Sequence, residues 1–123
     1  MTVDLNCDLG EGAGHDAELM AEITSANIAC GAHAGDESTM QATVALALAH
    51  GVAIGAHPGL PDRENFGRRE LSLRAGEAAE IVSRQVEALQ RIAARAGATI
   101  AHVKLHGALY TMAARDPVLA EEV

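Results

Sequence analysis

The sequence has few basic residues and few aromatic ones. Lys104 is its only lysine, Phe66 and Tyr110 are its only Phe, Tyr or Trp residues, and its formal net charge is −8 at pH 7. Binding to nucleic acids or to anionic membrane surfaces needs a basic patch. We therefore expect neither kind of binding, and a small molecule is the better expected ligand.

The scarcity of aromatic residues also limits how a core can be built. Because 49% of the residues are apolar, the core must come from Ala, Val, Ile and Leu, as is typical of helices packed on a parallel sheet. No apolar run approaches the roughly 18 residues of a membrane span, and no basic segment with a following apolar run is present at the start. We expect a cytoplasmic protein in which Cys7 and Cys30, which form no C-x-x-C pair, are buried reduced thiols.

The common phosphate-binding loops are missing too. The glycine-rich segment 10–14 would need glycine at position 15 to complete G-x-G-x-x-G, but that residue is His15. Glu11 would also bring a negative charge to the place of a pyrophosphate. No G-x-x-x-x-G-K-[ST] motif occurs. The glycines are instead expected to let the backbone turn sharply or approach a ligand.

What the sequence does contain is a regular alternation of predicted strands and helices. Segments 3–8, 25–30, 52–56 and 99–105 each have an apolar face and a polar or small-residue face. Helices are predicted over 15–23, from the cap Asp36 through Met40, Val44 and Leu48 to Gly51, over 73–96, from near Gly107, and from Pro117 after the cap Asp116. Four strand-then-helix units in a row imply an α/β fold with a parallel sheet and right-handed crossovers.

The two-faced strands favour one kind of α/β fold. In the first strand, apolar Val3, Leu5 and Cys7 alternate with polar side chains, whereas a doubly wound sheet is covered by helices on both faces and is apolar on both. A barrel has a lumen lined by one face only, so we predict a parallel (β/α) barrel. At 123 residues the chain is a single domain, 1–123, and is short for a closed barrel.

Four polar residues fall at the carboxyl ends of predicted strands. In a parallel sheet these ends share one edge, so Asp8, His33, His57 and His106 are expected to gather there. A carboxylate with imidazoles can bind a divalent ion or perform acid–base chemistry directly. The alternative is that each histidine is only a hydrogen-bonded strand-end residue, but three at matching positions favour a site.

Two kinds of cation could assist such a site. Lys104 is predicted to hold an oxyanion or phosphoryl oxygen and to pair with Asp8 at rest; the alternative is a structural salt bridge with Asp4, Asn6 or Asp8. Arg68 and Arg69, in the long loop 58–71, could clamp a substrate carboxylate bidentately. The alternative for this exposed pair is simple solvation.

Five blocks spread over the chain resemble a known family. They are DLNCDLGE at 4–11, NIACGAHAGD at 27–36, GAHPGLPD at 55–62, FGRR at 66–69 and VKLHGALY at 103–110. Together they resemble the A subunit of the bacterial 5-oxoprolinase, a family of lactam-utilisation proteins. The resemblance implies ATP-dependent opening of 5-oxoproline to glutamate with partner subunits B and C, on an irregular barrel similar to the polysaccharide-deacetylase fold.

The resemblance also implies roles for particular residues. Asp8, His57 and His106 become candidate ligands of a divalent metal (Mg, Mn or Zn), with His33 as a fourth. Lys104 would steady the lactam oxygen and His57 or His106 would move protons. We expect the remaining substrate contacts from Asn6, His33, Arg68 and Arg69.

The chain departs from the family pattern in two ways. Leu105 replaces the proline of the usual VKPHGALY block, and family members are about twice this length, as a closed barrel requires. We therefore expect the N-terminal half of a barrel, with about the first four βα units. If the 123 residues are the whole molecule, a homo-oligomer should bury the open sheet edges. The alternative functions are a metal-dependent amide or carbohydrate deacetylase and an inactive truncated half-barrel.

Overall fold

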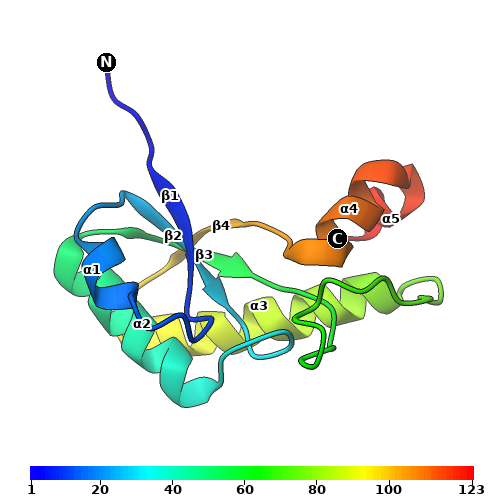
Figure 1. Cartoon of the computed structure of the whole chain (residues 1–123), viewed down its shortest axis with the longest axis horizontal. Coiled ribbons are helices and arrows are strands. Elements are labelled where there is room, and N and C mark those ends of the chain that lie inside the picture. Colours follow the sequence, from blue (N-terminus) through cyan, green and yellow to red (C-terminus); the bar gives the residue numbers. More distant parts are fainter.

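The computed structural model of the chain describes all 123 residues. Strands and helices alternate, as the sequence predicts, and Figure 1 shows their arrangement. In chain order they are β1 (Asn6–Leu9), α1 (Asp16–Met20), β2 (Ser25–Ala29), α2 (Glu37–His50), β3 (Ala53–His57), α3 (Glu77–Arg95), β4 (Ile100–Val103), α4 (Gly107–Arg115) and α5 (Pro117–Glu122). None of the helices combines the length and apolar character needed to cross a membrane.

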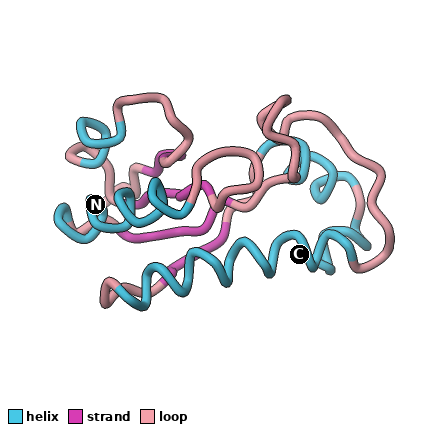
Figure 2. Tube along the Cα trace, turned by 90° about the horizontal axis from the view of Figure 1, so that it is seen from below, coloured by secondary structure: helices cyan, strands magenta, loops and turns pink.

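The four strands form one parallel sheet in the order β1-β2-β3-β4. Parallel pairing brings all four carboxyl ends to one edge of the sheet. Helices α2 and α3 pack against the strands, and α3 continues past them beside the long loop and α4 (Figures 1 and 2). The predicted α/β fold with a parallel sheet is thus confirmed.

The core lies between one face of the sheet and helices α2 and α3. Its members are small or branched residues, such as Ala26, Ile28 and Ile54 on the strands and Val44 and Leu89 on the helices. Full burial of an Ile, Val or Leu side chain contributes about 1.5–3 kcal/mol. Leu48, which follows Met40 and Val44 at four-residue spacing, is exposed, and Ala47 is buried in its place.

Local signals set the ends of several helices. The Asp36 carboxylate accepts a hydrogen bond from the Thr39 amide at 2.8 Å, and Gly51 ends α2 with a φ of 67°. Asp116 caps α5 in the same manner. The longest helix begins at Glu77 rather than near residue 73, because Gly76 adopts a left-handed φ of 79° that a helix cannot continue through.

Two strands differ from the predicted pattern. The start of β2 at Ser25 lies opposite Asn6, so residues 3–5 extend beyond the sheet, and Val3 and Leu5 are exposed rather than part of the core. In β4, Ile54 pairs with Ile100 but Gly55 pairs with His102, which leaves one extra residue in β4. This bulge turns Ile100 toward the core, although strict alternation would put it on the face of His102.

The opposite face of the sheet is polar. Hydrogen bonds run along it from Asp4 and Ser25 through Asn6 and Asn27 to Asp8. Asn27 is fully buried although it lies on this face. The face ends at the carboxyl ends of the strands, where the histidines predicted from the sequence are found.

Candidate functional site

Two histidines from neighbouring strand ends face each other. His57 is the last residue of β3, and His106 follows β4 as the residue before α4. Nδ1 of His57 lies 2.7 Å from the Lys104 carbonyl oxygen, and Nε2 of His106 lies 2.7 Å from the Phe66 carbonyl oxygen. Since a carbonyl only accepts, each of these nitrogens carries a proton. The remaining nitrogens, Nε2 of His57 and Nδ1 of His106, lie 3.0 Å apart.

A third histidine and a carboxylate complete this group. The His33 ring stacks on that of His106 with centroids 3.7 Å apart, and its Nε2 atom lies 2.8 Å from Oε1 of Glu11. The same oxygen is 3.7 Å from His57 and 3.6 Å from His106. Nδ1 of His33 is buried and has no hydrogen-bond partner. We call Glu11, His33, His57 and His106 the histidine centre.

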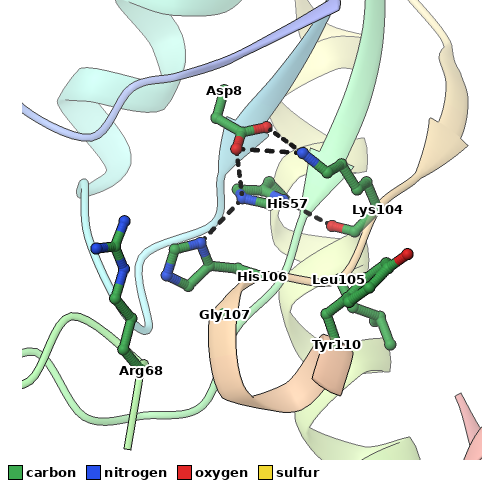
Figure 3. Close-up of a pocket in the computed structure, with 8 residues that line it drawn as sticks. All are labelled: Asp8, His57, Arg68, Lys104, Leu105, His106, Gly107 and Tyr110. Carbon is green, nitrogen blue, oxygen red and sulfur yellow. Dashed lines mark hydrogen bonds and ion pairs between the residues drawn. The ribbon is translucent and has the colours of Figure 1, made fainter. Parts of the chain in front are cut away.

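Asp8 and Lys104 lie beside the histidine centre. Nζ of Lys104 is 2.9 Å and 3.2 Å from the two carboxylate oxygens of Asp8. His57 lies between Asp8 and His106, with its Nε2 atom 3.5 Å from Oδ2 of Asp8 (Figure 3). The predicted pairing of Lys104 with Asp8 is therefore present, although the Lys104 side chain is 44% exposed rather than buried.

Burial and hydrogen bonding set the charges of these groups. Burial lowers the pKa of both His57 and His106, so each tends to be neutral. Burial alone would raise the pKa of Asp8, but hydrogen bonds from Asn27 and Lys104 outweigh it and hold that pKa below its usual value. Glu11 behaves in the same way, with His33 as its main partner. The site thus combines anionic carboxylates with neutral imidazoles.

The long loop after β3 is tied to the site by backbone contacts. Gln85 of α3 accepts from the Gly59 amide and donates to its carbonyl, at 3.1 Å and 2.8 Å. Arg63 donates to the carbonyl oxygens of Gly31 and Gly35. Phe66 has a left-handed φ of 55°, which turns its carbonyl toward His106. Such strain in a non-glycine residue costs about 1–3 kcal/mol and is common at functional sites.

A cavity of about 280 Å³ opens beside His57 and His106. Figure 3 shows the residues that line it: Asp8, His57, Arg68, Lys104, Leu105, His106, Gly107 and Tyr110. The lining thus combines one carboxylate, two cationic side chains, two imidazoles and one aromatic ring. The volume lies near the lower end of the range for small-molecule sites, and the cationic side chains in the lining outnumber the carboxylate.

The structure brings most of the predicted site residues together. Asp8, His33, His57, Lys104 and His106 lie in contact with one another, and Arg68 lines the cavity. Asn6 is exposed at the start of β1, away from the cavity, and is bonded to Asn27. Arg69 is exposed and does not line the cavity. The roles assigned to these residues stay predictions.

Sequence reasoning missed Glu11 as a member of the site. Glu11 lies two residues after the end of β1, in a glycine-rich loop. The glycine spacing of this loop was considered only as a possible phosphate-binding motif. Its position three residues after Asp8 was the available signal. The Phe66 carbonyl was also missed, and no sequence signal marks it, because a backbone oxygen is present at every residue.

The donor set of the histidine centre fits a divalent metal. One ligand atom from each of Glu11, His33, His57 and His106 lies within 4.8 Å of the others. Imidazole nitrogens with a carboxylate oxygen are ligands that zinc and manganese accept. This set contains His57, His106 and His33, which the resemblance gave as candidate ligands, and it has Glu11 in the place of Asp8.

Comparisons with known proteins agree with the sequence blocks. The LamB/YcsF family model matches residues 3–123. The A subunit of the Bordetella pertussis 5-oxoprolinase is 56% identical over 126 residues, and that of Brevibacillus brevis is 54% identical over 127. These alignments cover 98% and 99% of this chain but 50% of each relative, so the chain spans about half the length of the curated relatives it matches.

One solved structure resembles the whole chain closely. It is a lactam utilization protein from Thermus thermophilus, with a TM-score of 0.96 and 46% sequence identity. The match covers 99% of this chain and 51% of that chain.

Proposed function

Because the chain belongs to the LamB/YcsF family, we propose that it forms the N-terminal half of the A subunit of a 5-oxoprolinase. The proposed activity is ATP-dependent opening of the lactam 5-oxo-L-proline to L-glutamate, together with subunits B and C. The observation that carries the proposal is the cavity lined by His57 and His106 of the histidine centre, by the Asp8–Lys104 pair and by Arg68.

The proposed chemistry begins with the stability of the lactam. Its amide is unstrained, so hydrolysis needs activation, which transfer of a phosphoryl group from ATP to the amide oxygen provides. This transfer leaves ADP. Water then adds to the ring carbon, and the ring nitrogen leaves with a proton to give an acyl phosphate. A second water hydrolyses the acyl phosphate to the glutamate carboxylate and phosphate. ATP is a co-substrate, and this chain contains no conventional phosphate loop to bind it.

The residues of this chain have separate tasks in that reaction. Lys104 holds the amide oxygen, since its ammonium group faces the cavity from one side. His57 and His106 move protons, because burial keeps them neutral and each has a nitrogen free of carbonyl contacts. Arg68 binds the substrate carboxylate. If a divalent metal is bound, Glu11, His33, His57 and His106 would hold it, and it would polarise an oxygen or activate water.

Several observations support a barrel as the complete fold. The strands follow one another in sequence order without reversal, the core lies on one face, and the other face is polar. A barrel wall has these properties. The relatives have about as many residues again, which is enough for further βα units to close the sheet.

A second candidate function is favoured by the three histidines and the carboxylate. A metal-dependent deacetylase, acting on an amide or an acetylated carbohydrate, would use such a set without ATP or partners. A coupled assay separates the two: 5-oxoproline turnover that requires ATP and subunits B and C supports the first. Hydrolysis of acetylated sugars without ATP, lost on addition of a chelator, contradicts it and supports the deacetylase. Loss of both activities in this chain identifies an inactive half-barrel.

A further inference from the structure

His102 reaches across a neighbouring strand on the polar face of the sheet. It lies on β4, yet its Nε2 atom is 2.6 Å from Oδ1 of Asn27 on β2, so its ring passes over β3. The residue of β3 beneath it is Gly55, which pairs with His102. A Cβ atom at Gly55 would lie 2.0 Å from Nε2 of His102. The contact between His102 and Asn27 therefore requires glycine at position 55.

The direction of the hydrogen bonds beyond His102 is set by Asp8. The Asn27 side-chain nitrogen donates to Oδ1 of Asp8 at 2.8 Å, because a carboxylate only accepts. This orientation turns Oδ1 of Asn27 toward His102, so Nε2 of His102 must carry the proton that is donated. If the Asn27 amide were reversed, its oxygen would face the Asp8 carboxylate and repel it.

Two side chains at the end of β4 act on the Asp8 carboxylate. His102 lies on β4, and Lys104 directly follows its last residue. Lys104 binds the Asp8 carboxylate directly, and His102 acts on it through Asn27. We propose that His102 is a positioning residue, which through Asn27 fixes the Asp8 carboxylate in its contact with Lys104 at the edge of the cavity. The bulge in β4 is part of this device, because it turns His102 rather than its neighbours toward Gly55.

The proposal gives a reason for a costly arrangement. Asn27 is fully buried, and a buried amide is unfavourable unless its hydrogen bonds are made. An apolar pair at these positions would fill the same space at no such cost. An effect of His102 on substrate binding through Lys104 rests on the proposed function, in which Lys104 holds the lactam oxygen. The positioning of Asp8 by His102 does not depend on that function.

The only lysine of the chain provides a direct readout. Labelling with 15N-lysine gives a single side-chain ammonium signal by NMR, from Lys104. In His102→Leu, the ammonium group should exchange its protons with solvent roughly tenfold faster than in the unchanged chain, approaching the behaviour of Asp8→Asn, as expected for loss of one charged hydrogen bond. His102→Gln, whose terminal amide can donate like Nε2, should stay near the unchanged chain.

The outcomes distinguish positioning from a merely structural role. Equal exchange in His102→Leu and the unchanged chain overturns the proposal, and so does a His102→Gln variant that behaves like His102→Leu. A second measurement is independent of variants: imidazole nitrogen shifts should show the proton of His102 on Nε2, and a proton on Nδ1 alone contradicts the network. If these results hold while 5-oxoproline turnover is absent, the proposed function fails and the positioning of Asp8 stands.

Discussion

Nε2 of His57 lies 3.0 Å from Nδ1 of His106, and each ring donates from its other nitrogen to a backbone carbonyl. In their neutral forms the two facing nitrogens are both acceptors. Two facing acceptors at this distance can share a proton or a cation between them. The two backbone carbonyls thus prepare the pair either for proton transfer or for metal binding.

The free energy of unfolding should fall as the pH is lowered below about 6.5. Folding lowers the pKa of His57 and His106 through burial, so the unfolded chain takes up protons first, and stability is lost from the unfolded pKa down to the folded pKa values. Urea unfolding in a chelating buffer between about pH 5 and pH 8 measures this slope. In a double variant, His57→Gln with His106→Gln, the free energy of unfolding should depend less on pH. An unchanged dependence would show that other groups cause the loss of stability.

Titration with zinc or manganese should show one ion bound per chain. His106→Ala removes a ligand atom of the histidine centre, and Glu11→Gln replaces its carboxylate with a neutral amide. In each variant the affinity should fall by more than the roughly tenfold that loss of an outer-shell partner costs. His50→Ala is the matched control, because His50 lies at the exposed end of α2. If calorimetry finds equal metal affinity in His106→Ala, Glu11→Gln and His50→Ala, the histidine centre is not a metal site.

Lys104→Met should abolish activity without loss of stability. The variant keeps the aliphatic stem, and an ion pair with one side chain 44% exposed contributes no more than about 1 kcal/mol. Thermal melting and 5-oxoproline turnover measured on the same samples test both parts. Retained turnover would end the proposed role of Lys104 in holding the amide oxygen.

Gln85→Leu should destabilise the chain by about 1–3 kcal/mol, since it leaves both the amide and the carbonyl of buried Gly59 without a partner. Gln90→Leu, on an exposed part of the same helix, is the control and should change stability by less than about 0.5 kcal/mol. Equal effects in urea unfolding would show that the loop does not depend on Gln85.

The sequence was sufficient to predict an α/β fold with a parallel sheet but only part of the site, and the barrel stays a prediction. Periodicity and caps such as Asp36 and Gly51 act locally, so they indicate where elements lie. The bulge in β4 could not be predicted, because the extra residue is defined by its pairing with β3 and not by its own type. Glu11 was missed for a similar reason: only the folded loop brings it to the three histidines.

Produced by itself, the 123-residue chain should self-associate. Both β1 and β4 lie at the edges of the sheet and offer unpaired backbone groups, and the polar face has no opposite wall from this chain. Light scattering should give a mass above the 12.7 kDa of one chain. A stable monomer of that mass with cooperative melting would contradict the half-barrel account.

The most direct test of the histidine centre as the reaction centre is glutamate formation from 5-oxoproline. The chain, alone and joined to the residues that follow it in its relatives, would be combined with subunits B and C and ATP. At least one of these forms should produce glutamate. The rate should fall roughly 100-fold or more in His57→Ala and in His106→Ala, as expected for removal of an acid–base group. The rate of His50→Ala should change little. Glutamate formed at the unchanged rate by His57→Ala and His106→Ala would contradict this role of the histidine centre.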